Sequence, residues 1–445
     1  MHDQLAAAKA KTSENAVFSV DDESLIESEE LRNWWRLRSE KERGELETEK
    51  SVCLATGRFG SVCRTTGFIK LLGDDTKLIS FNKECPAFES HGLSQGANAP
   101  INSDAEVKFR AALNTLIEKS REQRLVFNDT AHLHWTRLPI ENDPIDLLAT
   151  ADVNAVASLL KSIQSGQPPA AIDANAYYAL SLSGNGARVV VRDWLESTVP
   201  EIKKHVAEWF QDLGIIAPDG AGVKRDFKFG ALLYGMVRAE LSELPPQIPT
   251  QLLHGALRGR SVPLPQSALT AVLRRQQLDQ ENKLNPARLA LIKACLLRSP
   301  NSQNHNSQTK DKTMTECLNP ESRDPSYLCG RLFAVFDRLQ YLAQGGVNAG
   351  VVERYYASAS TTPALVMGRL FRNAQFHLAK ADGGVAGNAA KDFEAITCAL
   401  GDQFPATLDL EGQGRFALGY YHQKAEYRRR TAERKEQQAA ETKPV

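Results

Sequence analysis

GRLFAVFDRLQYLAQ, residues 330–344, decides the fold of the C-terminal part of this chain. Its apolar side chains recur every three or four residues, which places them on one face of an α-helix. Gly345 and Gly346 follow, and glycine tolerates the left-handed conformation that closes a helix. The stretch therefore predicts an amphipathic helix. Its expected buried face consists of Leu332, Val335, Phe336, Leu339 and Leu342.

Three more amphipathic segments follow before Gln423. The second helix is expected to begin at Pro363, whose fixed φ suits a first turn, with Ser360 or Thr362 offering a hydroxyl to the free amides. The third ends at Gly401, and the fourth opens near Asp409. Four such helices on short connections predict an antiparallel bundle. Their expected buried side chains are Met367, Leu370, Phe371, Ala374 and Leu378, then Phe393, Ile396 and Leu400, then Phe416, Ala417, Tyr420 and Tyr421.

The N-terminal half has a different sequence pattern, with short apolar segments in place of long amphipathic ones. Residues 51–73 are short apolar pieces broken by glycine, a pattern that predicts strands and tight turns. Alternation over 176–194 predicts two strands around the turn 183–186, and 125–138 predicts one further strand. Residues 82–102 are rich in Gly, Pro, Asn and Ser and predict a loop without regular structure.

Two breaks organise the chain. The first is 244–249, LPPQIP, where two consecutive prolines block a helix. The second is 299–313, a polar linker without an apolar anchor. We therefore predict an α+β fold. Its parts are a mixed domain with short strands over residues 1–244, a helical connector and linker over 245–313, and a C-terminal helical bundle over 314–445. The C-terminal region is thus mostly helical and ends in the antiparallel four-helix bundle.

Composition limits the classes of function. Lys plus Arg and Asp plus Glu both total 54, so the formal net charge is zero. A dedicated, sequence-independent DNA binder usually has a basic excess, so any nucleic-acid surface here is expected to be local or to rely on partners. The seven cysteines form no CxxC pair, which favours reduced thiols in the cytoplasm. No apolar run approaches the ~20 residues that a membrane helix needs.

Arg188 and Arg192 are the first candidate nucleic-acid contacts. On one strand face and four residues apart, their guanidiniums would lie about 13 Å from each other, roughly two phosphate spacings along a strand. The alternative is surface ion pairing with Asp193 or Glu196, and we weigh the two equally.

The loop 82–102 supplies the other candidates. The amides of Asn82, Gln95, Asn98 and Asn102 both donate and accept hydrogen bonds, which suits base edges or sugars, and the flanking glycines allow close approach. The alternative is a structural loop that these amides hold together. Beyond the bundle, Arg428, Arg429 and Arg430 form a further cationic cluster that would contact a single strand or be solvated.

No catalytic residue, metal site or cofactor site is predicted. His132 and His134 have no third ligand of suitable type nearby, so a structural role is favoured. The turn 183–187 (SGNGA) lacks the lysine and following helix of a phosphate-binding loop and is interpreted as a hairpin turn.

Several of these stretches resemble one known family. Residues 330–340, 354–380 and 404–423 look like the C-terminal signature of the large subunit of type I-C CRISPR Cascade complexes. CLATG at 53–57 and YALSLSGNGARVVVRDW at 178–194 are similar to earlier blocks of the same family. Two further matching blocks are SFN with AFESHGLSQGANAP (80–82 and 87–100) and RLALIKACLLR (288–298).

The resemblance implies a non-enzymatic subunit of a crRNA-guided complex. Its expected partners are crRNA-bound backbone subunits, target double-stranded DNA with its displaced strand, and a helicase-nuclease effector, with no membrane. Expected roles are target binding, reading of the protospacer-adjacent motif and recruitment of the helicase-nuclease. Family members usually carry well over a hundred residues ahead of the block that begins here at Phe18, so we expect an N-terminal part of the family domain to be missing. Met314, between linker and bundle, is a candidate internal start for a separate small subunit.

Two rival functions remain open at this point. One is a nucleic-acid-processing hydrolase in the mixed domain. The other is a purely structural assembly subunit that does not contact DNA.

Overall fold

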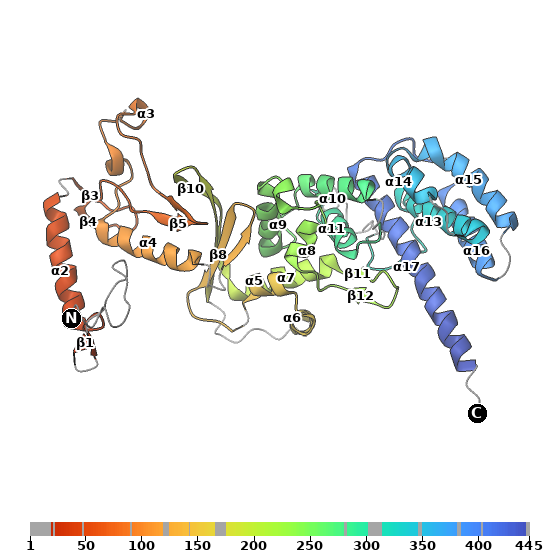
Figure 1. The fold of residues 1–445 in the computed structure, drawn as a ribbon, viewed down its shortest axis with the longest axis horizontal. Coiled ribbons are helices and arrows are strands. Elements are labelled where there is room, and N and C mark those ends of the chain that lie inside the picture. Colours follow the sequence, from red (N-terminus) through yellow and green to blue (C-terminus); the bar gives the residue numbers. More distant parts are fainter. Residues whose placement is uncertain are drawn as a thin grey trace, which may run out of the picture. The chain divides into compact units, whose positions relative to one another are not determined.

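The computed structural model describes residues 19–20, 23–46, 49–89, 91–118, 124–141, 143–164, 175–279, 283–300, 314–345, 349–380, 384–401 and 404–441. Contacts divide the chain into two compact units. Unit 1 comprises Met1–Glu118 and Gly184–Val190, and unit 2 comprises Lys119–Ser183 and Val191–Val445. The two are described separately below, with the elements labelled as in Figure 1.

Unit 1 is built from short strand pairs and helices. Each pair is antiparallel, as expected from the glycine-broken apolar pieces of this region. A small core beneath them is formed by Cys53, Ile101 and Ala105. The pairs are β1 (Ser19–Val20) with β2 (Glu23–Ser24), β3 (Lys50–Val52) with β4 (Phe59–Ser61), and β5 (Ile69–Leu71) with β6 (Asp74–Thr76). The helices are α2 (Glu29–Leu46), α3 (Pro86–Glu89), the 3-10 turn η1 (Gln95–Asn98) and α4 (Ser103–Ile117).

The predicted loop 82–102 is therefore not wholly irregular. It contains α3 and η1, each only four residues long. Both are single turns, because the glycines and prolines of the segment prevent longer helices. The Phe81 and Phe88 rings lie edge to face, with centroids 5.6 Å apart, and tie α3 back to the start of the loop.

Unit 2 begins with a four-stranded sheet of order β10-β9-β8-β7, of which residues 184–190, around the β9–β10 turn, are counted in unit 1. The predicted single strand over 125–138 is a hairpin instead. Asn128 takes a positive φ of 54°, which asparagine tolerates better than most residues, and turns the chain between two strands. The turn predicted at 183–186 lies slightly later, at Gly186 and Ala187. The strands are β7 (Arg124–Phe127), β8 (Thr130–Thr136), β9 (Ala176–Asn185) and β10 (Arg188–Thr198).

Helices form the larger core of unit 2, with α7 at its centre. Pro200 at the start of α7 and a capping box between Thr198 and Glu201 fix its first turn, and its Trp209 and Phe210 are fully buried. Buried Asp212 on α7 pairs with Arg298 at 2.7 Å and with Arg260 at 2.6 Å. The elements are α5 (Pro144–Thr150), α6 (Val153–Gln164), α7 (Val199–Leu213), β11 (Ile215–Ile216) with β12 (Val223–Lys224), α8 (Phe229–Tyr234), η3 (Leu241–Glu243), α9 (Gln247–Arg258), α10 (Gln266–Leu278) and α11 (Pro286–Leu297).

The C-terminal bundle contains the four predicted helices and one more. The additional helix, α14, ends at Thr361, and Pro363 directly starts the next helix because proline cannot continue the previous one. The first helix also begins earlier than predicted, capped by the Asp324 carboxylate. The bundle helices are α13 (Pro325–Gln344), α14 (Val351–Thr361), α15 (Pro363–Lys380), α16 (Gly384–Leu400) and α17 (Leu410–Glu441).

Within the bundle, the backbones of α13 and α17 approach closely where the two helices cross. A Cβ on Gly330 would lie 2.0 Å from the Phe416 carbonyl oxygen, and one on Gly419 would lie 2.1 Å from that of Tyr327. Only glycine fits at either position. Around this contact the rings of Phe333, Tyr356, Phe416 and Tyr420 pack at centroid distances of 5.4–5.9 Å.

The predicted fold class is confirmed: a mixed region with short strands is followed by helices that end in a bundle. The domain boundaries proposed at residues 244 and 313 stay predictions. None of the helices that the structure describes is both long enough and apolar enough to cross a membrane.

Candidate nucleic-acid interface

Unit 1 brings two of the predicted residues together. Arg188, the first residue of β10, donates from Nη2 to Oδ1 of Asn82 at 2.6 Å. Asn82 is exposed and Arg188 is half-buried. In the described part of the chain Arg188 has no carboxylate partner, so its charge is not neutralised locally. The pair therefore presents a guanidinium whose orientation is fixed and whose remaining N–H groups can donate to phosphate.

Lys77 belongs to the same cluster and was not predicted. Its amide donates to the Ala187 carbonyl at 2.9 Å, and its carbonyl accepts from the Val189 amide at 3.0 Å, so it flanks Arg188 in a parallel bridge. The Lys77 ammonium lies 5.0 Å from the centre of the Phe68 ring, which is 52% exposed. No local pattern predicts this pairing, because the two segments lie more than a hundred residues apart.

The other loop candidates have internal partners. The Asn98 amide donates to the Gln95 carbonyl at 3.2 Å, within η1. Asn102 occupies the N-cap position of α4 without a side-chain cap, its backbone pairs with Val62, and its backbone N–H donates to the Cys53 sulfur at 3.4 Å. The Asn102 Oδ1 is buried and has no hydrogen-bond partner among the described residues. These contacts hold the loop together, and binding by Gln95, Asn98 and Asn102 stays a prediction.

Arg192 lies on the same strand as Arg188 but belongs to unit 2. It is exposed, and its Nε donates to the Ser183 hydroxyl at 2.7 Å. Asp193, the alternative ion-pair partner considered from the sequence, instead pairs with Arg258 at 2.9 Å and His254 at 3.2 Å. Burial alone would raise the pKa of Asp193, but these partners hold it below its usual value.

Three aromatic side chains lie on the same sheet and were not singled out from the sequence. Trp135 on β8 pairs with Tyr178 on β9, with stacked rings 5.6 Å apart. Trp194 on β10 lies 5.7 Å from Trp135 and 5.9 Å from Tyr178 and is 47% exposed. Because side chains alternate along a strand, Trp194 shares a face of β10 with Arg192. A cation on the same face as an exposed aromatic ring is typical of single-strand nucleic-acid surfaces.

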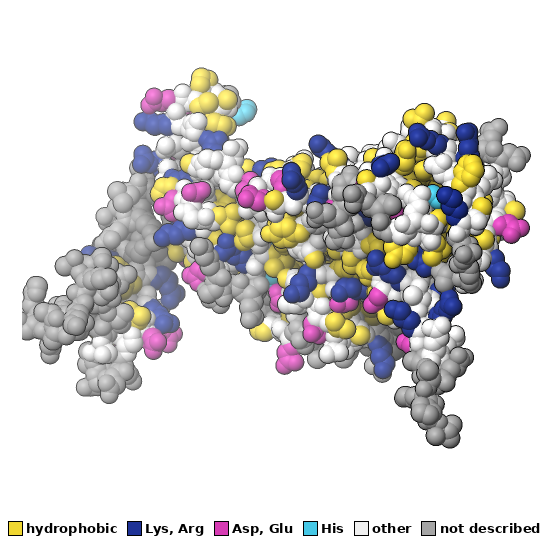
Figure 2. Space-filling model, turned by 45° about the vertical axis from the view of Figure 1, so that its right-hand side comes forward, with side chains coloured by type: hydrophobic (Ala, Val, Ile, Leu, Met, Phe, Trp, Pro, Cys, Tyr) yellow, Lys and Arg dark blue, Asp and Glu magenta, His cyan; other side chains and the backbone are white. Residues whose placement is uncertain are grey.

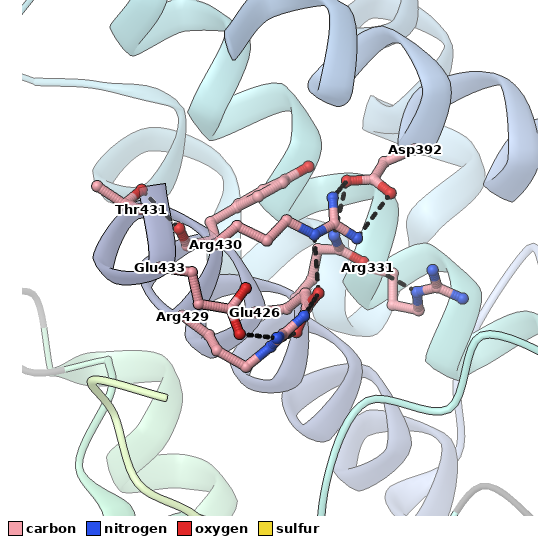
Figure 3. Close-up of polar contacts among 9 residues, drawn as sticks. Arg331, Asp392, Glu426, Arg429, Arg430, Thr431 and Glu433 are labelled. Carbon is pink, nitrogen blue, oxygen red and sulfur yellow. Dashed lines mark hydrogen bonds and ion pairs between the residues drawn. The ribbon is translucent and has the colours of Figure 1, made fainter. Parts of the chain in front are cut away.

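The three C-terminal arginines lie on the bundle helix α17, and two of them are neutralised by carboxylates (Figure 3), whereas Arg428 donates to the Pro218 carbonyl at 3.1 Å. Arg430 bonds to Asp392 at 2.8 Å and to Glu426 at 2.7 Å, and Arg429 bonds to Glu426 at 2.7 Å and to Glu433. These paired guanidiniums are poor candidates for phosphate contacts, because binding phosphate would require breaking existing ion pairs.

The burial and the hydrogen-bond partners of the two histidines of the sheet favour a structural role for both. His132 is buried, its Nδ1 lies 2.8 Å from the Ser181 hydroxyl, and burial lowers its pKa to about 4. His134 lies 3.1 Å from Asp143, whose other oxygen accepts from Tyr177 at 2.8 Å. Among the residues that the structure describes, no three His, Cys, Asp or Glu side chains are grouped to hold a metal ion.

These features define a protein with a mixed α+β region, a helical bundle, and cations that lie beside amides and aromatic rings. Comparison with protein families identifies the chain more specifically than these structural features do. The model of the CRISPR-associated protein (Cas_Csd1) family matches residues 1–428, and the chain belongs to this family. It is therefore a CRISPR-associated Cascade component, as the resemblance indicated. No curated protein shows significant similarity to the chain.

Proposed function

We propose that the chain is the large, non-catalytic subunit of a crRNA-guided type I-C Cascade complex in the cytoplasm. The observation that carries this proposal is the family match over residues 1–428. In such a complex, base pairing with the guide reads the target sequence, and the protein holds the nucleic acid and reads the adjacent motif. The proposed partners are the crRNA-bound backbone subunits, target DNA with its displaced strand, and the helicase-nuclease that degrades the target.

The surfaces described above support a role in holding nucleic acid. The Asn82–Arg188–Lys77 cluster of unit 1 and the Arg192–Trp194 face of unit 2 combine charge with polar or aromatic groups. The net charge of zero gives these clusters no general attraction for DNA. We therefore expect the isolated chain to bind DNA weakly at physiological salt and to contribute mainly within the complex.

The structural-subunit alternative makes a different prediction about these clusters. If the chain only holds other subunits together, charge reversal at Arg188 and Arg192 leaves target binding unchanged while assembly proceeds. The hydrolase alternative requires a reactive group that reaches substrate. His132 is 3% exposed and lies against Ser181, so it is a poor candidate for that role.

The test compares complexes reconstituted with and without this chain on a labelled double-stranded target. We expect omission of the chain to lower target affinity at least about tenfold, which is 1.4 kcal/mol. With Mg²⁺ present the DNA should stay intact until the helicase-nuclease is added. Cleavage by the chain alone, lost in His132→Ala, would establish the hydrolase instead.

A further inference from the structure

Helix α15 carries a stripe of polar side chains on a face with no acid. Its described residues, Pro363–Lys380, include no Asp or Glu. Arg369, Asn373 and His377 follow each other at intervals of four, which places them on one side of the helix. All three line the same cavity. On the adjacent turns of α15, Leu370 and Ala374 are buried in the bundle core, so the polar stripe lies at the edge of that core.

The opposite walls of this cavity come from α13 and α14. Gln340 contributes from α13 and accepts a hydrogen bond from the Val351 amide at 2.8 Å, which fixes the start of α14 beside it. Arg354 and Tyr355 contribute from α14. The cavity has a volume of about 140 Å³. Pockets for whole small molecules begin near ~300 Å³, so this one suits a single chemical group.

No described carboxylate is paired with the two arginines of the cavity. Arg354 and Arg369 are exposed, and neither has an ion-pair partner among the described residues. Glu353 is the neighbouring acid on α14, and its carboxylate is engaged by the Gly350 amide at 2.7 Å at the start of that helix. Arg429 and Arg430 of α17 provide the contrast, since both are bound to carboxylates. Figure 2 shows Lys and Arg side chains among apolar ones over the part of the chain that holds the bundle.

We propose that the cavity between α13, α14 and α15 binds one phosphate group. Two guanidiniums from different helices can donate to its oxygens as paired N–H groups, the geometry that makes arginine a preferred phosphate ligand. The Asn373 amide and the Tyr355 hydroxyl supply further donors on the same cavity.

His377 fits the same ligand. Partial burial, with Lys380 nearby, lowers its pKa, so at neutral pH the ring is uncharged and offers one N–H donor. The start of α14, with Gly350 and Val351, also lines the cavity. A metal cation is disfavoured, because the cavity presents cationic guanidiniums and no carboxylate.

Our identification of the molecule that carries this phosphate rests on the proposed function. In a nucleic-acid-binding subunit it is a phosphodiester of a bound single strand, and the exposed Phe376 on α15 offers a ring for a neighbouring base. A free nucleotide would offer the same chemical group. The two sources are separated by the probes below.

The experiment titrates the full chain at low salt with a labelled single-stranded oligonucleotide of about twelve nucleotides. AMP and inorganic phosphate are titrated separately by calorimetry. The test variant is Arg354→Gln with Arg369→Gln. The matched control is Arg372→Gln, an exposed arginine on α15 that does not line the cavity. Both positions of the test variant are exposed, so folding should be retained, and thermal melting checks this.

We expect the double variant to lose about tenfold or more in oligonucleotide affinity, and the control less than about twofold. The slope of the logarithm of the binding constant against the logarithm of salt concentration, called the salt slope below, should become shallower by about 0.7 for the one lost phosphate contact. Loss of AMP and phosphate binding with unchanged oligonucleotide binding would support the cavity and assign it to a free nucleotide. Equal behaviour of the double variant and the control with every probe would overturn the proposal.

Target binding by the reconstituted complex separates this proposal from the proposed function. If complexes carrying the double variant bind the target as the control does, and complexes lacking the chain do not, the cavity is not the phosphate site while the subunit role stands. If omission of the chain has no effect, the proposed function itself fails.

Discussion

Gly330→Ala is expected to loosen the bundle at the crossing of α13 and α17. A Cβ at this position would lie 2.0 Å from the Phe416 carbonyl oxygen, 2.8 Å from its carbon and 2.9 Å from the Tyr420 nitrogen. Ordinary contact begins near 3.4 Å, so the helices would have to separate by about 1.4 Å, the difference between the two distances. All three neighbours are backbone atoms, which cannot move away as a side chain would.

The magnitude follows from overpacking. Forcing an extra methyl group into a packed core costs about 1–3 kcal/mol, and contact with backbone on a second helix places this case at the upper end. Alanine gains about 1 kcal/mol over glycine in helix propensity, so the expected net loss is about 2 kcal/mol. Separation of the helices would also weaken the packing of Phe333 on Phe416, now 5.7 Å between ring centres.

Hydrogen exchange measured by mass spectrometry suits this test, because a chain of two units need not unfold in one step. A loss of about 2 kcal/mol should speed exchange in α13 and α17 peptides about thirtyfold. Gly368→Ala is the matched control. It lies in the interior of α15, and its added Cβ would meet no atom within 4 Å. Exchange in α15 should therefore slow slightly. Unchanged exchange in Gly330→Ala, or the same direction of change in both variants, would refute the close-contact reasoning.

The other predictions concern buried charge, acid stability and an internal start. Asp212→Ala should lower the free energy of unfolding in urea by about 3–5 kcal/mol, because it removes the carboxylate partner of the buried Arg298 guanidinium. Asp226→Ala removes one member of a partly exposed ion pair and should lower it by less than about 1 kcal/mol. Equal losses in the two variants would contradict this. Burial would raise the pKa of Glu426, but its arginine partners hold that pKa below 4.5. The ionised Glu426 carboxylate therefore stabilises the fold above pH 4.5, and this stabilisation is lost as the pH falls through the lowered pKa. Arg430→Ala should flatten this acid loss in melting curves, and an unchanged pH profile would count against it. If Met314 starts a separate small subunit, Met314→Leu should remove a product running from Met314 to Val445 in expression of the gene, whereas persistence of that product would exclude this start.

Helices with clear periodicity and end signals could be predicted from the sequence because their determinants are local. α15 starts at Pro363 and α16 ends directly before Gly401, both as predicted. α14 was missed because Val351–Thr361 is rich in serine and alanine, so its periodicity is weak, and its capping depends on Glu353 reaching back to Gly350. The hairpin over 124–136 was missed because it turns on the backbone conformation of Asn128.

The candidate site residues likewise divide into those that the sequence could indicate and those that only the fold brings together. Arg188 and Asn82 were singled out by residue type, but their hydrogen bond depends on tertiary packing. Lys77 could not be identified, because its pairing with Arg188 follows from the fold of unit 1. On α15, the spacing of Arg369, Asn373 and His377 is visible in the sequence, but only the fold places Arg354 across from them.

Target binding by a complex carrying Arg188→Glu and Arg192→Glu tests the central claim most directly. That claim is that a neutral subunit holds nucleic acid through a few cationic and polar groups. Provided that the complex assembles normally, we predict at least a tenfold loss of target affinity and a salt slope shallower by about 1.8, for two lost phosphate contacts on duplex DNA. Normal assembly with unchanged affinity and salt slope would contradict the claim.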